Sequence, residues 1–186
     1  MTADTSRANL PRWVGPLLGR PGVALAFAWG VAEGSFFFLV PDLLITLAAL
    51  FSARSSLRHL AAAVAGSLVA GLFLFGWAER DPEAAANAVG RVPFVSRAMF
   101  ETVARDFGEL GVWAMCKGPL SGIPYKVYAV EAAGRVALAP FLLVTWVLFA
   151  VAGRLIKPGH PGRAAVAMAG YALYWAGVYA YYWTAV

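Results

Sequence analysis

Two segments of the chain, residues 33–42 and 117–126, place ionisable side chains and prolines within otherwise apolar sequence. The first carries acids and the second carries bases. The residues concerned are Glu33, Pro41 and Asp42 in the first segment, and Lys117, Pro124, Tyr125 and Lys126 in the second. An ionisable side chain at the centre of a bilayer costs roughly 2.5–3.5 kcal/mol on insertion scales, so such a residue is a candidate for function.

These residue types suit the binding of an anion such as a phosphate group. Lys117 and Lys126 can supply positive charge, and Tyr125 adds a hydroxyl donor next to the second lysine. Glu33 and Asp42 can neutralise the lysines while the site is empty. Because burial favours the protonated form of a carboxylate, either acid could also couple anion release to a proton, which we state as a hypothesis.

The two prolines explain why these segments are expected to be broken. A proline removes a backbone donor and clashes with the preceding turn, so Pro41 and Pro124 each interrupt a helix. The sequence Gly34-Ser35 is a second weak point in the first segment. Broken helices at membrane depth are tolerated only against protein or a wet cavity, and paired broken segments in two halves of a chain indicate a transporter's substrate site.

Two simpler interpretations apply to the same residues. Glu33 and Lys126 can form a structural ion pair that holds the two segments together without binding a substrate. Alternatively, Lys126 can extend to the membrane surface and bind nothing. The single Cys116 excludes an internal disulfide and is predicted to be a small buried side chain.

The composition indicates a membrane protein. Of the 186 residues, 61% are hydrophobic and only 13% are charged, whereas about 25% are charged in a typical soluble domain. The mean hydropathy is +0.68. Three stretches, 61–78, 136–153 and 164–186, contain no charged residue, and each is close to the length of about 20 residues that a helix needs to cross a bilayer.

We therefore predict an all-α integral membrane protein with about three full transmembrane helices, two re-entrant helical hairpins in an inverted pseudo-repeat and one interfacial helix. Residues 1–20 form an N-terminal interfacial segment, and residues 21–186 form one membrane domain. Within that domain we expect a hairpin over 22–52, a crossing over 60–78, a polar interfacial linker over 79–109, a hairpin over 110–134 and crossings over 136–153 and 164–186. Residues 53–58 are expected to form a short polar turn, and 96–107 an amphipathic helix.

The distribution of arginines orients this layout. More Lys and Arg residues fall on the side of the N-terminus than on the opposite side, which places the N-terminus in the cytoplasm. The count is the same whether the segment 22–52 forms a hairpin or crosses once. The hairpin therefore depends on the proline break and on a length too great for one straight crossing and too small for two.

The quoted motifs resemble those of the DedA superfamily, also called the SNARE-associated or VTT-domain family, and are most similar to its small YqaA-like branch. The sequence Glu33-Gly-Ser-Phe-Phe-Phe-Leu-Val-Pro-Asp42 resembles the first signature, and Gly122-Ile-Pro-Tyr-Lys-Val-Tyr-Ala-Val-Glu-Ala-Ala-Gly134 resembles the second. Gly66 and Gly71 match the glycine-rich crossing between them, where they are expected to allow close helix packing. The chain departs from the family pattern at Glu131 and over 145–149.

This resemblance implies two re-entrant hairpins that meet at mid-membrane, and it implies lipid translocation. Bacterial members resemble carriers of undecaprenyl phosphate, and eukaryotic relatives scramble phospholipids. Glu33 and Asp42 match the family's acidic positions, while Lys126 and Lys117 match its basic positions.

We accordingly expect a lipid flippase or scramblase of the bacterial inner membrane, with protons as a candidate coupling ion. The main alternative is a non-transporting membrane-integrity or assembly protein whose charged hairpin tips are structural. A lipid-phosphate enzyme is disfavoured because the sequence shows no nucleophile–base arrangement. We expect no metal, no cofactor and no nucleic acid, and the oligomeric state stays open, with a homo-oligomer as one alternative.

Overall fold

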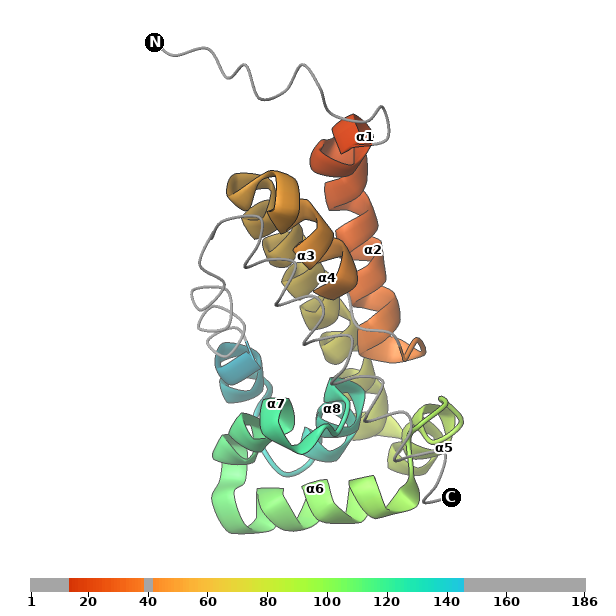
Figure 1. The fold of residues 1–186 in the computed structure, drawn as a ribbon. Coiled ribbons are helices and arrows are strands. Elements are labelled where there is room, and N and C mark those ends of the chain that lie inside the picture. The colour runs from red at the N-terminus through yellow and green to blue at the C-terminus, as the bar shows by residue number, and fades with distance from the viewer. Residues whose placement is uncertain (1–13, 39–41, 146–186) are drawn as a thin grey trace, which may run out of the picture.

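The computed structural model describes residues 14–38 and 42–145. Over this part of the chain the protein is all-helical, without a strand (Figure 1). The predictions for residues 1–13, for Pro41 and for the crossing over 164–186 lie outside the described residues. The elements, in chain order, are α1 (Val14–Leu18), α2 (Arg20–Ser35), α3 (Asp42–Phe51), α4 (Ala53–Arg80), α5 (Pro82–Val89), α6 (Arg97–Leu110), the 3₁₀ helix η2 (Gly111–Lys117), α7 (Gly118–Ser121) and α8 (Tyr125–Ala132).

The long helix α4 is the one helix among the described residues that is long and apolar enough to cross a membrane. Residues Arg54–Arg80 reach a mean hydropathy of 2.0 over their most apolar window, and at 1.5 Å per residue they span roughly 40 Å. Only 39% of that window is buried inside the protein, and Val69 and Phe73 are exposed. A helix this apolar in the core of a soluble protein would be largely enclosed, so the exposed face favours contact with lipid.

The α4 helix contains the predicted crossing over 60–78, but it also corrects one prediction. Residues 53–58, which we expected to form a polar turn, are the first turns of α4. Ser52 caps the helix by accepting a hydrogen bond from the Ser55 amide. The Ser55 and Ser56 hydroxyls donate to the carbonyls of Leu18 and Ile45. These serines therefore hold the start of α4 to its neighbours instead of facing water.

The segment before α4 is a helical hairpin. Helix α2 ends at Ser35, α3 begins at Asp42, and α4 begins directly after α3. The Ser55 hydroxyl lies 2.8 Å from the Leu18 carbonyl oxygen, so the start of α4 lies beside the start of α2. The chain therefore descends along α2, returns along α3 and descends again along α4 (Figure 1), as the break near Gly34-Ser35 and Pro41 predicted.

Helices α2 and α4 run parallel and pack closely through small residues. The backbone of Ala63 fills the space where a side chain on Gly30 would lie, and the Phe27 carbonyl fills the same space at Gly66. The Ser67 hydroxyl donates to the Gly30 carbonyl at 3.3 Å. The predicted packing role of Gly66 is thus confirmed, and such close approach of backbones is common between membrane helices.

The predicted linker over 79–109 folds into two helices. Asp81 caps α5 by accepting a hydrogen bond from the Ala84 amide at 2.9 Å. Helix α6 confirms the predicted amphipathic helix, and it runs across the base of the other helices in Figure 1. Its buried residues follow helical spacing, and they are Met99, Phe100, Val103, Asp106 and Phe107.

The second broken segment is more irregular than the first. The 3₁₀ helix η2 leads into the four-residue α7, and residues 122–124 then leave helical conformation before α8. Gly122 has φ +71°, a left-handed conformation that a side chain would disfavour. Cys116 in η2 is exposed, so the prediction that it is buried is wrong; η2 buries the neighbouring Ala114 and Met115 instead. Residues 138–145 begin the predicted crossing over 136–153 and are helical.

A single methyl group tests the packing of α2 on α4. The substitution Gly66→Ala should lower the thermal unfolding midpoint in detergent, because overpacking a close contact costs typically 1–3 kcal/mol. The matched control is Gly76→Ala on the same helix, where an added side chain meets nothing within 4 Å. This control should be neutral or stabilising, because alanine favours helix over glycine by roughly 1 kcal/mol. Equal midpoints for the two variants would contradict the close packing.

Candidate functional site

The two broken segments meet at one buried ion pair, between Glu33 and Lys126. The Lys126 Nζ lies 3.7 Å from the Glu33 Oε1, and the exposed fractions of the two side chains are 1% and 11%. Glu33 lies in the last turn of α2, and Lys126 lies in the first turn of α8. The alternative in which Lys126 extends to the surface is therefore wrong. A lysine this deeply buried requires a carboxylate partner, because an isolated charge in a dry interior costs several kcal/mol.

Tyr125 precedes the buried lysine and lies in the same cluster. Its ring stacks on Phe141 with centroids 5.9 Å apart and planes 18° apart. Its buried hydroxyl occupies the space beside Gly71, where a side chain would collide with it. The predicted contact role of Gly71 is confirmed, and its partner is the tyrosine that we selected as a candidate ligand.

Lys117 pairs with a residue outside the cluster of Glu33, Tyr125 and Lys126. Its Nζ lies 2.6 Å from the Asp106 Oδ1 on α6, and the Lys117 side chain is 47% exposed while that of Asp106 is 9% exposed. The four predicted charged residues are thus not all brought together: Glu33 and Lys126 form one pair, and Lys117 forms another. Sequence reasoning missed Asp106, although its spacing from Met99 and Val103 places it on the buried face of α6.

The remaining predicted residues are placed as follows. Asp42 begins α3, and its side chain, like the whole of Pro41, lies outside the described residues. Pro124 directly precedes α8 in extended conformation, with φ −61° and ψ 142°, so it breaks the chain where the sequence predicted. Glu131 and Arg135 form a local ion pair, with 2.7 Å between the Arg135 Nη1 and the Glu131 Oε2. No group of three or more metal-binding side chains occurs among the described residues.

The arrangement can exchange one anion for another. Lys126 is a buried cation whose present partner is a side-chain carboxylate, and a phosphate oxygen could take the place of that carboxylate. Tyr125 supplies a second donor group on the same helical turn. No protein-family model, no curated protein and no solved structure matches the chain. The chemistry of the site therefore has to be argued from these contacts and from the sequence motifs.

The interaction energy between Glu33 and Lys126 can be measured from the stabilities of single and double variants. Glu33→Gln and Lys126→Met should each lower the stability of the purified protein by about 3–5 kcal/mol, because each leaves the other charge buried and unpaired. The double variant should recover most of this loss, since it buries no charge. The control Arg91→Met should have a much smaller effect, because Arg91 is exposed. Strictly additive losses in the double variant would show that the two side chains do not interact.

Proposed function

We propose that this protein is a lipid translocase that moves a lipid with a phosphate-bearing headgroup across a membrane. The observation that carries the proposal is the Glu33–Lys126 pair, which is buried and joins the two broken segments. An ion pair is weak as a source of stability, because apolar residues of similar volume often do as well or better. Its position at two helix breaks beside an apolar spanning helix instead suits a substrate site.

The proposed cycle uses the pair as its switch. A phosphate oxygen replaces the Glu33 carboxylate at Lys126, and Glu33 takes up a proton while it lacks its partner. When the headgroup leaves, Glu33 loses the proton and pairs with Lys126 again. Lysine is a compact point charge and not a bidentate fork, so this site should tolerate headgroups of varied shape around the phosphate.

The membrane topology forms part of the proposal. Helix α4 crosses the bilayer, while α2–α3 and the segment 110–134 enter as re-entrant hairpins whose tips meet at Glu33 and Lys126. Support comes from the return of the chain after α3 to the start of α2, from the lengths of α2 and α3, 16 and 10 residues, and from the resemblance to the DedA superfamily. At 1.5 Å per residue, α2 spans roughly 24 Å, short of the hydrocarbon thickness of about 30 Å. The arginine distribution places the N-terminus in the cytoplasm of a bacterial inner membrane.

The second candidate function is a membrane-integrity or assembly protein in which the same pair is only structural. One observation favours it: the ion pair between Glu33 and Lys126 joins α2 to α8, so it could hold the two segments together without binding a substrate. The two functions differ in one respect. A structural lock works with either order of charges, whereas a phosphate site requires the cation on α8 beside Tyr125.

Transport by a charge-swapped variant separates these functions. In vesicles of phosphatidylcholine that contain a fluorescent lipid phosphate, the native protein should move the lipid between leaflets. The double variant Glu33→Lys with Lys126→Glu should fold, because the pair persists, but it should lose transport, because the cation has moved away from Tyr125. Glu131→Gln, which alters only the local pair with Arg135, serves as the matched control and should retain transport.

Each outcome of that assay has one meaning. Absence of transport in the native protein would contradict the translocase and favour the structural role, and transport by the swapped variant at the native rate would show that the pair is not the headgroup site. An imposed pH gradient should change the initial rate of the native protein if Glu33 carries the proton. An unchanged rate would remove proton coupling from the cycle.

The hairpin predicts that two distant basic residues face the same side of the membrane. With Cys116→Ser as background, single cysteines at Arg20 and Arg54 should react with an impermeant maleimide from the cytoplasmic side in inverted vesicles. Arg80, at the other end of α4, should react only from the opposite side. If cysteines at Arg20 and Arg54 react from opposite sides, the segment 22–52 crosses the membrane and the re-entrant hairpin is wrong.

A further inference from the structure

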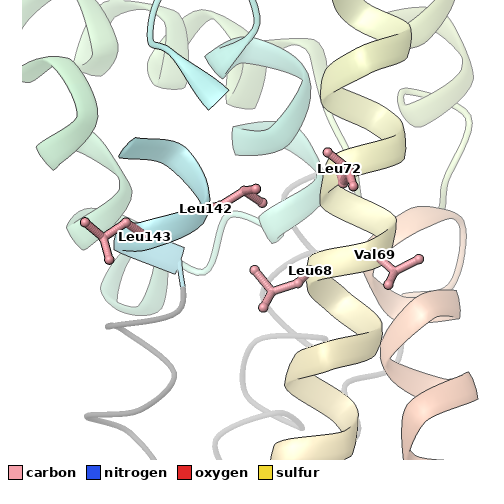
Figure 2. A pocket seen from close by; sticks show the side chains of 5 residues that line it. All are labelled: Leu68, Val69, Leu72, Leu142 and Leu143. Carbon is pink, nitrogen blue, oxygen red and sulfur yellow. The ribbon is translucent and has the colours of Figure 1, made fainter. Parts of the chain in front are cut away.

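An aliphatic groove runs along α4 next to the buried ion pair. Its walls are Leu68, Val69 and Leu72 on α4 and Leu142 and Leu143 on the helical segment 138–145, and its volume is about 380 Å³. In Figure 2, Leu142 extends from its helix toward α4, and Leu68 extends from α4 toward that helix. Every lining side chain is a branched hydrocarbon, and the volume lies within the range of roughly 300–1,000 Å³ that is typical of ligand sites.

The groove lies on the same two helices that the Tyr125 side chain contacts. Leu72 directly follows Gly71, which makes room for the Tyr125 hydroxyl, and Leu142 directly follows Phe141, on which the Tyr125 ring stacks. Tyr125 in turn precedes Lys126, the buried cation. The hydrocarbon groove therefore lies on the two helices that contact the phenol preceding the buried amine. The apolar groove and the buried amine thus complement the two parts of an amphiphile, which are an apolar chain and an anionic headgroup.

We propose that the groove binds one hydrocarbon chain of the same lipid whose phosphate group binds at Lys126. This inference rests on the proposed translocase function and specifies which part of the lipid each surface recognises. The positive charge of Lys126 selects an anionic headgroup, while the branched aliphatic walls select a flexible chain over a polar or aromatic group. Tyr125 lies between the two surfaces, at the junction of headgroup and chain.

A second ligand requirement follows from this arrangement. A phosphate compound without a hydrocarbon chain makes only half of the contacts, so it should compete poorly with a full lipid. A neutral lipid with the same chain lacks the partner for Lys126 and should also bind weakly. The site therefore distinguishes the ligand from free phosphate and from a neutral lipid with the same chain.

Photolabelling tests the proposal directly. The intact protein in phosphatidylcholine vesicles is exposed to a long-chain lipid phosphate that carries a diazirine in its chain. Mass spectrometry that assigns the label to single residues should find it on Leu68, Leu72 and Leu142 in excess over Phe73. Phe73 is 62% exposed and does not line the groove, so it reports random contact with the surrounding lipid.

Substitutions that fill the groove provide the second measurement. Leu72→Trp should reduce both the groove label and the transport rate by about tenfold, which corresponds to about 1.4 kcal/mol of lost binding free energy. The matched control is Phe73→Trp on the neighbouring position, which should leave both unchanged. Leu142→Ala provides a second variant, which enlarges the groove and should shift the preference toward bulkier branched chains if Leu72→Trp fails to fold.

The remaining outcomes overturn the proposal. Equal labelling of the groove and of Phe73 would show that only bulk lipid occupies it. A disulfide between cysteines at Leu72 and at a residue of 164–186, with no groove label, would show that the chain itself fills it. If the native protein transports the lipid and Leu72→Trp transports it at the same rate, this inference fails while the proposed function stands. If the native protein transports none, the proposed function fails first.

Discussion

Burial of Lys126 is the constraint on which the rest of this structure depends. With 1% of its side chain exposed, the lysine is stabilised as a cation by a carboxylate within reach, and this carboxylate comes from a helix about ninety positions earlier in the chain. To supply it, α2 must lie against the same part of α4 as α8 does. The close contacts of Gly30 and Gly66 between α2 and α4, and of Gly71 with Tyr125 on α8, permit this approach. The small residues on α4 thus allow α2 and α8 to approach closely enough for Glu33 and Lys126 to pair.

The positions of the two charges are unfavourable within their own helices. Glu33 lies at the C-terminal end of α2, which is the negative end of the helix dipole, and Lys126 lies at the N-terminal end of α8, which is the positive end. Each charge is instead next to the favourable end of the other helix. The helix dipoles alone disfavour a charge at either position. The two charges are stabilised only because the tertiary structure brings them together.

The sequence predicted the features that depend on local chemistry or on composition. The break after Gly34-Ser35, the extended backbone at Pro124, the amphipathic α6 and the close packing at Gly66 and Gly71 all follow from properties of single residues or short repeats. The pairing of Glu33 with Lys126 was one of two alternatives, since opposite charges in apolar sequence must either meet or reach water. The structure selects the first alternative.

The features that the sequence did not predict depend on neighbours distant in the chain. Residues 53–58 contain two arginines and two serines, and in isolation they suggest a turn. They are helical because Ser55 and Ser56 donate to carbonyls of α1 and α3, so their polarity is satisfied by protein. Lys117 was expected at the central site, but Asp106 lies at 2.6 Å on the adjacent α6. Helical spacing could place Asp106 on the buried face of α6, but only the tertiary packing of α6 against η2 shows that it is the partner of Lys117.

The C-terminal end of α2 and the N-terminal end of α8, which meet at the ion pair, affect the binding of an anion at Lys126. Any negative group that replaces Glu33 at Lys126 also comes next to the positive end of α8, so it gains the same two favourable interactions that the carboxylate had. Glu33, once displaced, remains at the negative end of α2 without a cation, which disfavours its charged form. In the proposed cycle, the exchange of carboxylate for phosphate would therefore favour uptake of a proton by Glu33. Reversal of each helix end would remove this coupling, so the direction of α2 and α8 matters as much as the identity of the two side chains.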